Sequence, residues 1–198
     1  MALAESERIA QLLTKDAGNI VTAVLFAKDY ETKKHSERVA KYSREIAIRY
    51  GLTEEAEIIT IWALLHDVGK IGIPEYILNK PASLTDEEYE IVKNHSIIGE
   101  DILKNLNGTY GDAAKVVRSH HERFDGQGYP YGIAGEDIPM EARIVAVADA
   151  YDEMMAEKVF AMPLSKEQAK EEIKNGSGSK FDPEFASIML QIIDEEPN

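Results

Sequence analysis

Apolar side chains recur at spacings of three and four along most of the chain, which is the pattern of amphipathic α-helices. One such stretch covers residues 4–28, with a break expected near Gly18. The next covers residues 32–50, and Gly51 suits the position directly after a helix. No segment of useful length alternates apolar and polar residues as a half-buried strand does. The pattern predicts an all-α protein.

Capping signals place the later helices. Thr85 and Glu88 form a capping box at the start of one helix, and Pro183 suits the first position of the last helix. Gly and Pro residues predict irregular backbone over 70–85 and 122–138. The other helices are expected from 53 to about 67 and near 96–106, 109–121, 139–155, 165–174 and 183–194. We therefore expect one domain of about seven to nine helices over 29–198, after an N-terminal helical extension over 1–28.

Composition narrows the possible partners and the kind of metal site. The 198 residues carry a formal net charge of −14, which disfavours binding to polymeric nucleic acid or to an anionic membrane. We expect no membrane segment and no export signal, because no apolar stretch is long enough. The chain has no cysteine, which fits a cytoplasmic protein and leaves His, Asp and Glu as the available metal ligands.

The five histidines lie at helix ends or one turn into helices, near carboxylates. Imidazole and carboxylate groups suit iron, manganese and zinc. Neighbouring residues such as His66-Asp67 and His120-His121 cannot point the same way, but they can serve two metals with the carboxylate bridging. Two metals roughly 3.5–4 Å apart are a common device for cleaving phosphate esters. The adjacent pairs therefore favour a multinuclear site.

Structural roles remain open for these residues on spacing alone. His95 could be a capping residue at a helix end, and Glu31 could be a solvated surface residue. Asp67 could cap a helix, and Lys70 could interact with a helix dipole.

Five motifs, in order, resemble those of the HD-GYP family, a branch of the HD superfamily of metal-dependent phosphohydrolases. They are HSERV (35–39), LLHDVGKIGIP (64–74), HSIIGEDIL (95–103), VVRSHHERFDGQGYP (116–130) and RIVAVADAYDEM (143–154). The resemblance implies a helical domain with a metal cluster in its core and an irregular Gly-Tyr-Pro loop. It also implies hydrolysis of cyclic di-GMP to pGpG, and in some members to GMP, with two or three divalent metals, iron foremost and manganese as the other choice.

The resemblance also implies roles for individual residues. The metal ligands would be His35, His66, Asp67, His95, His120, His121 and Asp149, with Glu31 as a ligand of a third metal. The catalytic residues would be Asp67 and Lys70, assisting in-line attack by a metal-bridging hydroxide. The substrate contacts would be Lys70, Arg123, Gly128, Tyr129, Pro130, Asp152 and Lys158. Glu122 and Asp125 would brace the loop. A packed loop aromatic is the alternative role for Tyr129.

The segment after Asp152 departs from the family pattern. Lys158 stands where arginine is usual, Val159 replaces proline, Phe160 replaces tyrosine, and Ala161 stands where a basic residue is common. Fewer phosphate-binding cations imply weaker binding or a different ligand.

We interpret the chain as a cyclic di-GMP phosphodiesterase, with GGDEF or other signalling proteins as partners. The alternatives are an HD phosphohydrolase of another nucleotide, a cyclic di-GMP sensor with little turnover, and a structural helical interaction domain.

Overall fold

The computed structural model describes residues 30–104, 106, 110–156 and 162–196. The helices expected over 4–28, and the extension over 1–28, lie outside these residues. Within them the regular structure is helical, apart from one isolated bridge between Ser177 and Phe181, so the expected all-α class is confirmed. The elements are α2 (Tyr30–Tyr50), α3 (Ala56–Leu65), η1 (Val68–Gly72), α4 (Glu75–Leu78), α5 (Asp86–Lys93), α6 (His95–Lys104), α7 (Tyr110–Ser119), η2 (Gly135–Asp137), α8 (Met140–Met155), α9 (Lys166–Gly176) and α10 (Pro183–Glu195).

The local signals locate most helix ends within a few residues. The backbone N–H of Glu88 donates to Thr85 Oγ1 at 3.3 Å, and Thr85 N–H donates to Glu88 Oε2 at 2.8 Å, which completes the expected capping box. Gly51 follows α2 with a φ of +104°, a conformation that glycine adopts without steric cost.

The segment over 70–85 is more regular than expected. It contains the end of η1 and the short helix α4, so the prediction of wholly irregular backbone there was wrong. Pro74 occupies the N-cap of α4, where its missing N–H costs no helical hydrogen bond.

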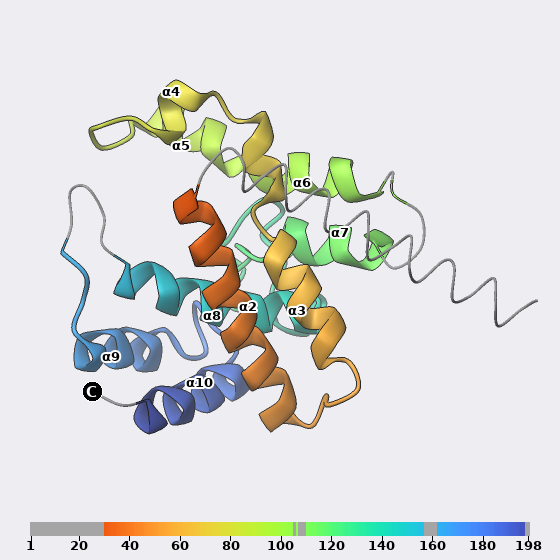
Figure 1. The fold of residues 1–198 in the computed structure, drawn as a ribbon, viewed down its shortest axis with the longest axis vertical. Coiled ribbons are helices and arrows are strands. Elements are labelled where there is room, and N and C mark those ends of the chain that lie inside the picture. The colour runs from red at the N-terminus through yellow and green to blue at the C-terminus, as the bar shows by residue number, and fades with distance from the viewer. Residues whose placement is uncertain (1–29, 105, 107–109, 157–161, 197–198) are drawn as a thin grey trace, which may run out of the picture.

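Helix α8 lies inside the helical assembly and contacts α2, α7, α9 and α10 (Figure 1). Its side chains Ile144, Val145, Val147 and Ala148 are fully buried. Each large apolar side chain buried in this way contributes about 1.5–3 kcal/mol. Helices α4 and α5 lie at one end of the molecule, while α9 and α10 lie at the opposite end (Figure 1).

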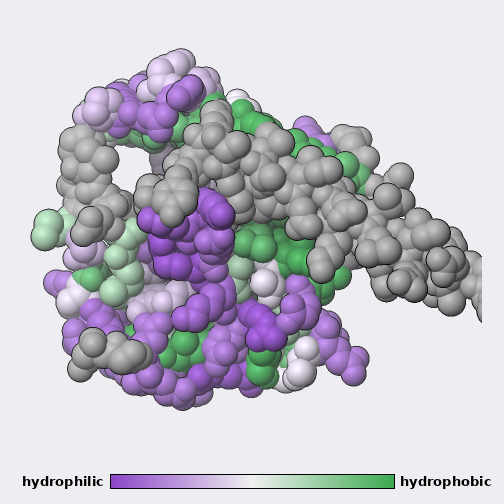
Figure 2. Space-filling model, in the orientation of Figure 1, coloured by the Kyte–Doolittle hydropathy of each residue, from purple (hydrophilic) through white to green (hydrophobic). Residues whose placement is uncertain are grey.

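On the face shown in Figure 2, hydrophilic residues gather over the N-terminal part of α2. No helix within the described part of the chain is long and apolar enough to cross a membrane.

Glycines bring η1 and α6 into backbone contact. A Cβ atom on Gly69 would lie 1.8 Å from the carbonyl oxygen of His95 and 2.5 Å from the amide nitrogen of Gly99. Only a residue without a side chain fits there. This contact brings the end of α3 close to the start of α6, where the candidate metal ligands lie.

Candidate metal centre

Residues from five segments converge on one buried region. Seven of the eight residues expected to bind metal have described side chains, and all seven lie there. They are His35 on α2, His66 after α3, Asp67 before η1, His95 at the start of α6, His120 and His121 after α7, and Asp149 on α8. The side chain of the eighth, Glu31, lies outside the described residues.

The first group consists of His35, His66 and Asp149. The Nε2 atom of His35 lies 3.1 Å from Asp149 Oδ1 and 3.3 Å from His66 Nε2. The Nε2 atom of His66 lies 3.7 Å from the same carboxylate oxygen. These atoms are close enough to bind one metal ion together.

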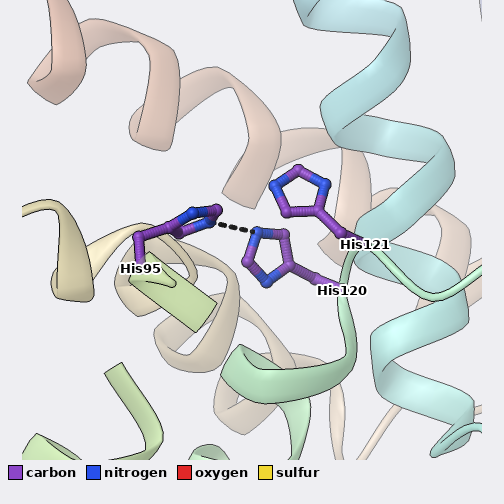
Figure 3. Close-up of side chains that lie close together, drawn as sticks. All are labelled: His95, His120 and His121. Atoms are coloured by element: carbon purple, nitrogen blue, oxygen red, sulfur yellow. Dashed lines mark hydrogen bonds between the residues drawn. The ribbon is translucent and has the colours of Figure 1, made fainter. Parts of the chain in front are cut away.

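The second group consists of His95, His120 and His121, whose rings point toward one another (Figure 3). The Nε2 atoms of His95 and His120 lie 3.3 Å apart. The ring of His121 lies 4.0 Å from that of His120 and 5.0 Å from that of His95, measured between centroids.

Asp67 lies between the two groups. Its Oδ2 atom is 3.3 Å from His66 Nε2, and its Oδ1 atom is 3.5 Å from His95 Nε2. One carboxylate oxygen therefore faces each group. Each of the two oxygens would thus be available to a different metal ion.

Backbone carbonyls orient three of the imidazole rings. His66, His95 and His120 each direct Nδ1 at the carbonyl oxygen three residues earlier. The acceptors are Ala63, Val92 and Val117, at 2.7, 2.7 and 2.6 Å. A carbonyl oxygen can only accept, so each Nδ1 carries the proton and each neutral ring presents an Nε2 lone pair to the centre.

This orientation fits a divalent cation. Two lone pairs that face each other 3.3 Å apart repel, and a cation between them removes the repulsion. Histidine and carboxylate donors suit iron, manganese or zinc.

Burial keeps the second group of histidines neutral. It lowers the pKa of His95, it holds the pKa of His120 well below the usual range, and it lowers that of His121 to about 3. A neutral imidazole is the form that binds metal.

The carboxylates make the centre attractive to positive charge. Burial alone would raise the pKa values of Asp67 and Asp149. Burial is the largest single effect, but Lys70 together with His66 and His95 outweighs it at Asp67, so the pKa of Asp67 lies well below the usual range. At Asp149 the hydrogen bond to His35 and the charges of His66 and His121 together do the same, and they lower its pKa as well. Burial would likewise lower the pKa of His35, but Asp149 and Asp152 raise it to about 10. The site thus favours a cation near His35, whether a proton or a metal.

Asp152 orients His35. Its Oδ2 atom accepts from His35 Nδ1 at 2.8 Å, and its carboxylate also accepts from Arg38 Nε at 2.5 Å and Nη2 at 2.9 Å. Asp152 is 3% exposed and is held by these contacts, and its expected role in substrate binding stays a prediction. Sequence reasoning missed Arg38, although its position one helical turn after His35 was an available signal.

Two of the basic residues expected at the substrate side form ion pairs. Lys70 Nζ lies 2.5 Å from Asp67 Oδ2. Arg123 binds Asp125 through both Nε and Nη2, at 3.0 and 2.5 Å. Lys158, with the neighbouring departures from the family pattern, lies outside the described residues.

The Gly-Tyr-Pro loop folds back onto the histidine pair. A Cβ atom on Gly128 would lie 2.3 Å from Arg123 N and 2.6 Å from His121 O. This glycine therefore permits close packing of the loop on its own backbone, a use we had not predicted. Tyr129 N–H donates to His121 O at 3.2 Å, and the Tyr129 ring lies 4.8 Å from the His121 ring.

The expected bracing of this loop is present. Glu122 Oε1 accepts from the backbone N–H of Tyr131 at 2.8 Å. Asp125 Oδ1 accepts from the backbone N–H of Gln127 at 3.0 Å, in addition to its pair with Arg123.

A cavity of about 450 Å³ opens beside the centre. His120, His121 and Asp149 line it, together with Arg123. Tyr129 and Pro130 line a different cavity of about 420 Å³, which they share with residues of α5 and α6.

Comparisons with known proteins agree with this architecture. The HD domain family model matches residues 19–185. A "cyclic di-GMP phosphodiesterase" of Thermotoga maritima is 42% identical over 83% of this chain and 45% of its own length. A "3'3'-cGAMP-specific phosphodiesterase 2" of Vibrio cholerae is 39% identical over 89% of this chain and 34% of its own length. The chain thus spans less than half the length of these relatives.

A solved structure shares the fold. An "HDG"Y"P protein" from Bdellovibrio bacteriovorus superposes with a TM-score of 0.66 at 23% identity, over 82% of this chain and 52% of that one.

Proposed function

Because the chain belongs to the HD domain family, we propose that it hydrolyses cyclic di-GMP to pGpG at the residues described above, with further cleavage to GMP as the alternative end point. The placement of Asp67 between two histidine groups supports this most directly, since it suits two metals about 4 Å apart. The names of the relatives from Thermotoga maritima and Vibrio cholerae support a cyclic dinucleotide as the substrate class.

The proposed first site uses His35, His66 and Asp149, and the second uses His95, His120 and His121. When bound, two divalent cations would stabilise charge on phosphoryl oxygens and lower the pKa of a water. Asp67 would hold the two sites together.

Lys70 is the proposed catalytic cation of the protein itself. It has the largest effect of the charged neighbours that lower the pKa of Asp67, and its Nζ atom lies 2.5 Å from Asp67 Oδ2. Its Nζ would also stabilise charge on the leaving oxygen. Neither residue is a nucleophile in this proposal.

Turnover of a panel of substrates tests the assignment. Metal-replete protein should convert cyclic di-GMP to pGpG faster than it cleaves 3'3'-cGAMP or mononucleotides. Faster cleavage of a mononucleotide would favour an HD phosphohydrolase of another nucleotide. Binding of cyclic di-GMP without any pGpG under reducing conditions would favour a sensor.

We propose iron as the metal, with manganese as the alternative, and Glu31 as a ligand of a third ion. Elemental analysis of anaerobically prepared protein tests both points. Three metals per chain should fall to two in Glu31→Ala. An unchanged count would reject Glu31 as a ligand.

We further propose a cytoplasmic location and control by signalling partners such as GGDEF proteins. The cysteine-free sequence supports the location. Pull-down with GGDEF domains, with and without cyclic di-GMP, tests the partners.

A further inference from the structure

The cavity beside the histidines must accept negative charge if the proposed function holds. His120, His121 and Asp149 line one part of it. A phosphodiester at these residues would leave the remainder of its molecule in the cavity. A cyclic dinucleotide carries a second phosphate there, although Glu153 and Glu172 also line the cavity.

Lys180 is the cavity cation best placed to bind that phosphate. It lines the cavity and forms no ion pair with any residue that the structure describes. By contrast, Arg123 is held by Asp125, and Lys70 is held by Asp67. A cation without an acidic partner gives up no existing pair when it binds phosphate.

The backbone at Lys180 is attached to the loop that follows the histidine pair. Its carbonyl oxygen accepts from Phe124 N–H at 3.3 Å, and Ser179 O accepts from Asp125 N–H at 2.8 Å. Phe181, next in the chain, is only 8% exposed. These contacts fix the backbone of Lys180 at the cavity wall, so only its exposed side chain has to be ordered when it binds a ligand.

We infer that Lys180 binds the uncleaved phosphate of a cyclic dinucleotide whose other phosphate lies at His120, His121 and Asp149. The inference rests on the proposed function. It gives the loop between α9 and α10 a part in substrate binding, which the sequence motifs did not indicate.

Lys180→Ala tests the inference against two substrates. Cyclic di-GMP has two phosphates, whereas bis(p-nitrophenyl) phosphate has one. At low salt the variant should raise KM for cyclic di-GMP about threefold to fivefold, the effect of losing one exposed charge contact. Its KM and kcat for bis(p-nitrophenyl) phosphate should be unchanged. Lys180→Arg should stay within about twofold of the wild type, because it keeps the charge.

Lys174→Ala is the matched control, because Lys174 is an exposed lysine on α9 that does not line the cavity. This control variant should leave KM and kcat unchanged with both substrates. Unchanged kinetics of Lys180→Ala with cyclic di-GMP would overturn the inference, and so would an equal loss with both substrates.

Failure of the proposed function looks different. In that case the wild type cleaves bis(p-nitrophenyl) phosphate but no cyclic dinucleotide. The Kd of cyclic di-GMP, measured for the wild type and for Lys180→Ala, then tests whether Lys180 contacts the ligand. Weaker binding by Lys180→Ala supports the contact, and equal binding rejects it.

Discussion

The Nε2 atoms of His95 and His120 face each other across 3.3 Å, while the Nδ1 atom of each ring points at a backbone carbonyl. In neutral rings these Nε2 atoms both carry lone pairs, so the arrangement is most stable with a cation nearby.

Chelation should therefore destabilise the protein. Metal at a hundredfold excess over its Kd contributes about 2.7 kcal/mol, so stripping it should lower Tm by about 5–10 °C. Differential scanning fluorimetry with a chelator measures this, and added Mn²⁺ or Fe²⁺ should restore the loss. An unchanged Tm in protein that elemental analysis finds metal-free would contradict the assignment.

Substitution of Asp67 should weaken metal binding at both groups of ligands, whereas substitution of His95 should weaken it only at the group that contains His120 and His121. We expect Asp67→Ala to lower metal content by more than one ion per chain and to reduce kcat more than about a hundredfold. His95→Ala should lower the content by about one ion. Elemental analysis of both variants, purified side by side, makes the comparison. Equal metal loss in the two would argue against a bridging role.

Removal of the carboxylate that orients His35 should weaken metal binding without removing a ligand. We expect Asp152→Asn and Arg38→Ala each to weaken metal affinity about tenfold to a hundredfold. Competition with a metallochromic chelator measures the affinity. Arg44→Ala is the control. Arg44 lies farther along α2 and pairs with the exposed Glu57 of α3, so this substitution should leave the metal affinity unchanged.

A side chain at position 128 should displace the loop from His121. The Cβ atom of Gly128→Ala would lie 2.3 Å from the backbone nitrogen of Arg123, so we expect a loss of about 2–4 kcal/mol in the free energy of unfolding. Gly135→Ala is the control in the same loop. Its Cβ atom would meet nothing within 4 Å, and its φ of +57° should cost only about 1–2 kcal/mol. Denaturant unfolding measures both, and equal losses would reject the packing argument.

The contact between η1 and α6 allows a similar comparison. The Cβ atom of Gly69→Ala would lie 1.8 Å from His95 O, so this variant should lose more than about 3 kcal/mol or fail to fold. That of Gly72→Ala would meet only the side chain of Ile98, at 3.0 Å, and the flexible chain can move. Soluble yield and Tm distinguish the two, with Gly72→Ala expected near wild type.

The helical fold was predictable because its signals are local. Caps such as Thr85 and breakers such as Gly51 act within one turn of the chain. The adjacent pairs His66-Asp67 and His120-His121 indicated a multinuclear site from the sequence alone. The full set was predictable only through family resemblance, because residues as distant as His35 and Asp149 meet through tertiary packing.

The partners of individual side chains were less predictable. Family resemblance suggested a substrate contact for Asp152, but its pair with Arg38, 114 residues away in the chain, could not be read from the local sequence. Lys180 lies on a polar turn that resembles an ordinary linker in sequence. Its place at the cavity comes from backbone pairing with Phe124, which leaves no trace in residue type.

Three of the histidines take their orientation from main-chain oxygens, and this gives the centre a form of mutational robustness. Substituting Ala63, Val92 or Val117 changes a side chain but leaves the carbonyl that each ring uses. His35 is different, because its partner Asp152 can be lost in a single codon change. Genetic variation should therefore be tolerated unevenly around the centre. Substitutions of Asp152 or Arg38 should therefore be the first to weaken metal binding without changing a metal ligand.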